Sequence, residues 1–261
     1  MKKSLFIVMT LMSIQASATT LATGPNSVYI QQLGSSNRVT IEQVGGTNKV
    51  GGVTNTTDTT VDSTGLTTLS PAEPSSGNYG TISGSSNNVT VTQHGSGNNS
   101  QYDMQGGHNN YTSTVTGNSN KTSLTIGDQN NSTNNYNTVN ETITGDSNLI
   151  IAKIVGSHDT STTTITGNSN QVTQTQTTSN ASVSNTVSGD SNVFNVQQTD
   201  AAGAGGHMLV MNTSGNYNSI TTQQQGTNDT TVNINTVGSN NTITVRTSSS
   251  AIVSPVTAIA R

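Results

Sequence analysis

The sequence predicts an all-β fold, a β-solenoid of stacked strand-arc-strand-arc rungs. Three observations support this prediction: glycines recur at 11-residue spacing, apolar and polar residues alternate between them, and the composition is too polar for a conventional core. Two 11-residue half-repeats give about 22 residues per rung, and one rung buries too little apolar surface to be stable without its neighbours.

The composition excludes several classes of protein. Hydrophobic residues make up 28% and aromatic residues 3% of the chain, which has no Cys or Trp. Charged residues (8%) and four prolines are too few for a typical disordered chain. Asn, Thr, Ser, Gln and Gly dominate, and they suit stacked β structure with side-chain amide ladders. The net charge of −4 is spread thinly, so we expect no nucleic-acid partner.

The N-terminus has the form of a secretion signal. Lys2 and Lys3 precede an apolar run at residues 5–14, and Ala16-Ser17-Ala18 is a small-x-small cleavage motif. We predict that residues 1–18 are removed and that the protein is secreted. The apolar run is about half of the ~20 residues that a spanning helix needs, so we expect no membrane span. Without Cys, the exported chain has to be stable without disulfides.

Glycine marks the arcs of the repeat. A G-x-x-N pattern recurs along the chain, and its half-repeats are too short to contain a helix, so each is one strand and one arc. Glycine supplies positive φ at little steric cost, and we expect the adjacent Asn or Asp to share this conformation. The predicted arc glycines are Gly34, Gly45, Gly84, Gly95, Gly117, Gly145, Gly167, Gly189 and Gly215.

Alternate residues between the glycines are predicted to face inward. In one unit these are Asn37, Val39, Ile41 and Gln43. The Asn beside an arc and the Gln near a strand end would stack on their equivalents and hydrogen-bond along the axis. The predicted ladder residues are Gln32, Asn37, Gln43, Asn48, Asn87, Gln93, Asn98, Asn120, Asn148, Asn170, Asn192, Gln198, Asn218 and Gln224.

Two segments break the period. Residues 51–83 contain Pro71 and Pro74 and are predicted to form a low-complexity insert loop. This loop would separate the first repeats, residues 19–50, from the main repeat region, residues 84–245. Residues 246–261 lose the pattern and form either a C-terminal tail or a cap.

The repeat also resembles a known family. The cycle N-S-x-x-x-x-Q-x-G-x-x-N in GPNSVYIQQLGSSN, and again in VTVTQHGSGNNS at residues 89–100, is similar to the curlin repeat of curli, the extracellular amyloid fibres of bacteria. The match is strong at residues 24–48 and 84–110, whereas elsewhere residues such as Val115 and Ile143 replace the Gln before the glycine. The resemblance implies export through an outer-membrane secretion channel and assembly with other curlin-type subunits or a nucleator.

Metal-binding and catalytic interpretations have less support. The four histidines lie in or beside arcs of different units, so we expect them to be solvated: His94, His108, His158 and His207. Asp128, Asp146 and Asp190 follow arc glycines as in calcium-binding β-rolls. Uncharged residues hold the same place at Asn118, Asn168 and Asn216. We therefore expect no metal and no cofactor, and, without a recognisable catalytic grouping, no enzymatic activity.

These observations predict a secreted structural subunit that self-assembles by strand stacking. The product would be curli-like extracellular amyloid, a cell-surface fibre for biofilm matrix and surface adhesion, and the main partner would be further copies of the chain. The alternative is a non-polymerising Thr-rich β-solenoid that acts as an ice-binding protein or adhesin. Its grid would use outward T-x-T pairs at Thr90/Thr92, Thr114/Thr116, Thr142/Thr144, Thr164/Thr166 and Thr173/Thr175.

Overall fold

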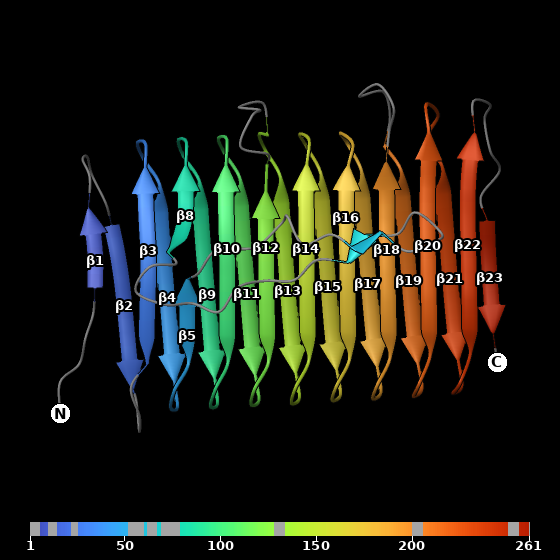
Figure 1. The fold of residues 1–261 in the computed structure, drawn as a ribbon, viewed down its shortest axis with the longest axis horizontal. Helices are drawn as coiled ribbons and strands as arrows, with labels where there is room; N and C mark the ends of the chain where they lie inside the picture. Colours follow the sequence, from blue (N-terminus) through green and yellow to red (C-terminus); the bar gives the residue numbers. More distant parts are fainter. Residues whose placement is uncertain are drawn as a thin grey trace.

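The computed structural model is a β-solenoid in which two parallel sheets face each other along a common axis (Figure 1). It describes residues 6–9, 15–21, 26–51, 60–61, 67–68, 79–127, 134–199, 206–249 and 256–260, and no helix occurs among them. Stacked strands are about 23 residues apart in sequence and make about 8 turns. The predicted fold class is confirmed.

The two sheets divide the strands by alternate half-repeats. Sheet A contains β1 (Phe6–Met9), β3 (Ser27–Leu33), β5 (Lys49–Gly51), β8 (Gly80–Ser83), β10 (Asn99–Gln105), β12 (Lys121–Ile126), β14 (Leu149–Val155), β16 (Gln171–Thr177), β18 (Val193–Thr199), β20 (Ser219–Gly226) and β22 (Thr242–Ser249). Sheet B contains β2 (Gln15–Leu21), β4 (Arg38–Val44), β9 (Asn88–His94), β11 (Asn110–Thr116), β13 (Thr138–Thr144), β15 (Thr160–Thr166), β17 (Ser182–Ser188), β19 (Met208–Ser214), β21 (Thr231–Val237) and β23 (Val256–Ala260).

The insert interrupts a strand rather than an arc. Ser27 to Tyr29 of β3 pair with β5, and Ile30 to Leu33 pair with β8, so β5 and β8 together occupy one strand position. The predicted boundaries at 51 and 83 are therefore wrong, because Gly51 and β8 belong to the sheet. Between them, β6 (Thr60–Val61) and β7 (Thr67–Thr68) pair antiparallel; the prolines of the insert lie outside the described residues.

Both ends of the chain contribute strands. β22 continues to Ser249 and β23 pairs with β21, so the sheets extend beyond the predicted boundary at 245. At the other end, β1 and β2 pair with β3 and β4, although they overlap the predicted leader. Removal of residues 1–18 stays a prediction, and it would leave β3 as the N-terminal edge of sheet A.

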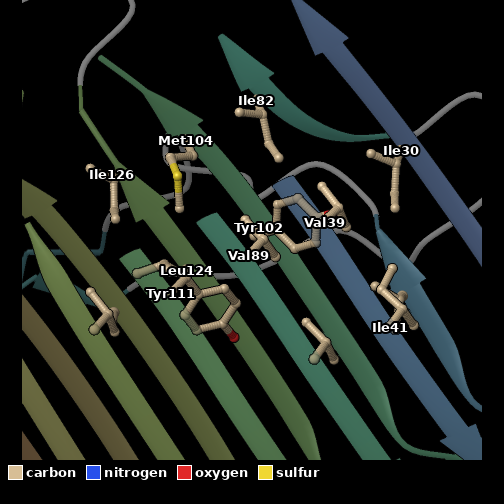
Figure 2. Packing of buried hydrophobic residues seen from close by; sticks show 14 of the residues in the cluster. Ile30, Val39, Ile41, Ile82, Val89, Tyr102, Met104, Tyr111, Leu124 and Ile126 are labelled. Carbon is tan, nitrogen blue, oxygen red and sulfur yellow. The ribbon is translucent and has the colours of Figure 1, made fainter. Parts of the chain in front are cut away.

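The core is a narrow apolar seam between the two sheets (Figure 2). Inward residues at equivalent positions stack from rung to rung, and the two largest buried side chains, Tyr102 and Tyr111, lie with their ring centroids 6.2 Å apart. Gly80 lies in the same inward column as Tyr102, and a β-carbon there would lie 3.0 Å from the Tyr102 ring. The missing side chain of Gly80 therefore makes room for the buried tyrosine.

The outer face of sheet A is covered along one column. Gln101, Ser123, Ile151 and Thr173 are register partners that point away from the core, yet each is at most 4% exposed. An outward side chain is buried only where other chain segments lie over it. The outer face of sheet A is therefore not open to solvent along this column.

The composite strand predicts that the insert can be deleted. Joining Gly51 directly to Gly80 gives a continuous seven-residue strand in register with β3 and β10, so deletion of residues 52–79 should preserve the β-sheet circular dichroism spectrum and cooperative unfolding. The deletion also removes the entropic cost of closing this loop, which changes the free energy of unfolding by only about 1–3 kcal/mol.

The matched control deletes residues 52–78 and leaves Tyr79 as one extra residue. This shifts β8 by one position, turns its inward side chains outward and should lower the unfolding midpoint strongly. Equal damage by both deletions would contradict the composite strand.

Candidate functional site

The arcs from sheet B to sheet A, the B-to-A arcs, hold an unbroken column of asparagines. The Asn170 amide illustrates each link: its Nδ2 donates to Asn148 Oδ1 (3.1 Å) and to the Gly189 carbonyl (2.8 Å), and its Oδ1 accepts the Asn192 backbone N–H (3.0 Å). The column consists of Asn26, Asn48, Asn98, Asn120, Asn148, Asn170, Asn192, Asn218 and Asn241. These bonds satisfy polar groups of the arc that burial would otherwise leave unpaired.

The arcs from sheet A to sheet B, the A-to-B arcs, hold a second asparagine column. This column is present only in the first rungs, and other residues replace asparagine in the later ones. Asn37, Asn87, Asn109 and Asn137 are linked from side chain to backbone, and Asn137 Oδ1 accepts the Asp159 N–H (2.9 Å). Asp159 Oδ1 accepts the Ala181 N–H (2.8 Å), after which alanine has no side-chain acceptor to offer. Two residues of this column were not among the predicted ladder residues: Asn109, which closes GGHN, and Asn137, which has no arc glycine directly before it.

The predicted glutamines form two short ladders instead of one long one. Gln43 Nε2 donates to Gln93 (2.8 Å), and Gln198 Nε2 donates to Gln224 (2.8 Å). Gln176, which the sequence analysis did not select, extends the second ladder through a bond to Gln198 (3.1 Å). Gln32 is also buried, but its register partner is Ile82, which cannot continue a ladder.

In most arcs two residues have left-handed backbone, whereas the arcs that begin at Asn134 and Thr178 have one each, Tyr136 and Asn180. All the predicted arc glycines have φ between 107° and 135°, and a β-carbon at Gly145 would overlap the Gly167 carbonyl oxygen. The second left-handed residue is the third of the arc, such as Ser147 (φ 58°), and not the adjacent Asn or Asp as predicted. The adjacent residue instead uses its side chain to link rungs.

That second arc position forms an exposed outer ladder. Asp146 Oδ1 accepts the Asn118 N–H (2.6 Å), and Asp190 Oδ1 accepts the Asn168 N–H (2.6 Å), while Asn216 Oδ1 accepts the Asp190 N–H (2.7 Å). Acids and amides alternate along the column, so the two carboxylates are separated by Asn168. Asp128 lies outside the described residues.

The histidines occupy three different environments. His94 is exposed and 3.2 Å from Glu42, whereas the exposed rings of His108 and His158 stack on either face of Tyr136 (centroids 4.8 and 5.2 Å apart). His207 is only 1% exposed, so the expectation that it is solvated is wrong; it takes the ladder position in its arc, and its Nδ1 is 3.0 Å from Thr230 Oγ1. The described residues contain no group of three potential metal ligands.

Two buried carboxylic acids have no ion pair with a cation among the described residues. Burial raises the pKa of Glu141 to about 7, although a hydrogen bond from Tyr111 (2.8 Å) opposes the rise. Burial also raises the pKa of Asp159 to about 7, against the opposing hydrogen bond from the Ala181 N–H. Burial also raises the pKa of a third acid, Asp103.

Sheet B presents a flat grid of threonines on its outer face. Thr92, Thr114, Thr142, Thr164 and Thr186 are successive register partners on β9 to β17. A neighbouring column contains Thr116, Thr144 and Thr166. The outward positions of these five strands hold Thr, Ser, Asn and His94, and no Lys, Arg, Asp or Glu. Thr173 and Thr175 are not part of this grid, because they lie on sheet A and Thr173 is 3% exposed.

Comparisons with known proteins assign no relatives: no family model, no curated protein and no solved structure matches the chain. Within the described residues, no helix is long and apolar enough to cross a membrane. The ends of the stack, where strands and ladders stop, and the threonine grid on the outer face of sheet B are the candidate contact surfaces.

The asparagine ladder predicts a large difference between two neighbouring residues. Asn170→Ala removes an acceptor from Asn192 and a donor from Gly189 in a buried arc, so it should lower the free energy of unfolding by about 2–4 kcal/mol. Asn168→Ala is the control in the same arc, because water can replace its exposed bonds; we expect a loss below about 1 kcal/mol. Equal losses in denaturant titrations would contradict a stabilising role for the inner ladder.

Proposed function

We propose that the chain is a secreted structural subunit that polymerises end to end into curli-like, cross-β fibres. The observation that carries this proposal is the state of the stack ends: β22 and β23 are the last strands of their sheets, each paired on one side only. Such edges accept another strand through backbone hydrogen bonds. Biofilm matrix and surface adhesion are the roles that a fibre of this kind would serve.

The ladders support growth with a fixed direction. In every link of the B-to-A column, Oδ1 of one asparagine accepts the backbone N–H of the asparagine in the next rung. Asn241 therefore ends the column on the acceptor side and Asn26 begins it on the donor side. The two ends are complementary rather than identical, which favours open head-to-tail growth over a closed dimer.

The core supports the same mechanism. Val245 of β22 points inward in the last rung of sheet A and is 9% exposed, and Ile243 is partly buried beside the core. A further rung stacked on this end would cover these side chains and extend the apolar seam. The contact is strand addition, as in the interior of the solenoid, and needs no chemical step.

A lysine at the end of the seam should block growth. In Val245→Lys, the single chain can place the ammonium in water beyond the last rung, whereas stacking another copy would bury the charge. We expect at least a tenfold slower elongation of seeded fibres, followed by light scattering, with an unchanged circular dichroism spectrum of the monomer.

The matched control is Val193→Lys, which adds the same charge at a 44% exposed outward position of β18 and should elongate normally. A meridional reflection near ~4.7 Å is expected from wild-type fibres. Wild-type protein that remains monomeric when seeded would contradict the proposal.

The threonine grid favours a second candidate function, binding to ice by a non-polymerising chain. Its neighbouring threonine positions are spaced about 4.8 Å across strands and about 6.6 Å along a strand, which gives an uncharged and regular surface for ordered water. Sheet A offers no equal surface, because its central outward column is covered.

This second candidate predicts thermal hysteresis of the monomer. The double substitution Thr142→Tyr and Thr164→Tyr should abolish hysteresis, because two bulky rings interrupt the grid while tyrosine keeps good strand propensity. Thr221→Tyr on the outer face of sheet A is the control and should leave hysteresis unchanged. Wild-type protein without hysteresis, or equal loss in both variants, would reject ice binding.

A further inference from the structure

Asp159 occupies a place in the A-to-B ladder that requires a hydrogen-bond donor. In the preceding rungs, the side-chain Nδ2 donates to a carbonyl of the next arc, as Asn137 does to the Gly156 carbonyl (2.9 Å). The corresponding carbonyl for Asp159 is that of Thr178. A β-carbon built on Gly156 would overlap the Thr178 carbonyl oxygen and lie 2.7 Å from Asp159 Oδ2, so these two oxygens lie close together.

Two oxygen atoms attract each other at this place only if one carries a proton. Asp159 is 0% exposed, and its Oδ2 has no hydrogen-bond partner as a carboxylate. A protonated carboxyl can donate from Oδ2 to the Thr178 carbonyl and still accept the Ala181 N–H at Oδ1. It then reproduces both bonds of an asparagine, whereas the ionised form directs negative charge at a carbonyl oxygen.

Glu141 also lies in surroundings that favour a protonated carboxyl. It is the one inward-facing acid among the described strands, and it is 2% exposed between Ser113 and Thr163 in its column. Its Oε2 accepts the Tyr111 hydroxyl, while Oε1 has no partner. The inward residues of the facing strands are uncharged: Thr122, Leu124, Ile126, Ile150, Ala152 and Ile154.

In the part of the chain that the structure describes, no ion pair joins a cation to either acid. Tyr111 is the titratable residue that faces Glu141. The ladder neighbours of Asp159 are Asn137 and Ala181, which are uncharged. The ring of the adjacent His158 stacks on Tyr136, and Lys153 lies on the outward side of β14. A buried carboxyl without a cation is stable in its neutral form.

We infer that Asp159 and Glu141 are two proton-binding sites that make the rungs from β13 to β15 more stable in acid than above neutral pH. Both pKa values rise on folding, from 3.8 for Asp159 and 4.5 for Glu141 to about 7, so the folded chain binds protons more tightly than the unfolded chain. The added stability is complete below the unfolded pKa values, is lost as the pH rises to about 7, and changes no further above it.

The test is the pH dependence of denaturant unfolding of the full chain between pH 4.5 and pH 8. Each acid should reduce the folding equilibrium constant by up to about tenfold per pH unit below pH 7. Asp159→Asn and Glu141→Gln should each remove a large share of the pH dependence, and the double variant should keep only a residual part, to which the raised pKa of Asp103 contributes. Asp159→Asn should also be more stable than wild type at pH 8, because its amide donates at every pH.

Asp190→Asn is the matched control, since it makes the same change at an exposed arc position and should retain the wild-type pH dependence. Infrared spectra provide a second measurement that does not depend on unfolding: at pH 6 the wild type should show a protonated carboxyl band that weakens in each single variant and is weakest in the double variant. A double variant with wild-type pH dependence, or wild type without the band, would overturn the inference. The test applies to the single chain and is independent of fibre formation.

Discussion

Each arc of this solenoid has to bury backbone and amide groups, and only the next rung can satisfy them. The B-to-A asparagine column meets this need with one residue per rung, which accepts a backbone N–H on one side and donates to an arc carbonyl on the other. The short spacing between rungs requires glycine at the first arc position, where a β-carbon at Gly145 would overlap the following carbonyl. The same constraint places Gly and Asn at fixed offsets in the B-to-A arcs from Gly45 to Asn241.

Because each rung depends on its neighbours for these bonds, the fold tolerates additions that preserve register. The insert leaves sheet A after Gly51 and returns at Gly80, yet β3 and β10 both pair with β5 and β8. The chain between Gly127 and Asn134 also exceeds an ordinary arc, while β11 pairs with β13 and β12 with β14 in register. The connections between strands can therefore vary in length as long as the strands keep their register in the sheets.

The same dependence leaves the ends of the stack and the exceptions to the ladder as the places where function can arise. An end rung has the donors, acceptors and apolar seam of an interior rung without a neighbour on one side, which is the physical basis of the proposed growth. In the A-to-B arcs, Asp159, Ala181 and His207 replace asparagine, and the proposed proton-binding site of this column is Asp159. The threonine face is independent of both, since its side chains point away from every ladder.

The sequence by itself determined the repeat length, the two-sheet solenoid and which residues face inward, because the glycine spacing and the two-residue alternation are local consequences of strand and arc geometry. It also pointed to the amides, since a buried amide needs a periodic partner. Only the tertiary structure decided that the insert divides a strand, that His207 is buried and that Thr173 lies on a different face from Thr164. These outcomes depend on which residues from distant rungs become neighbours, and periodicity within one rung carries no information about that.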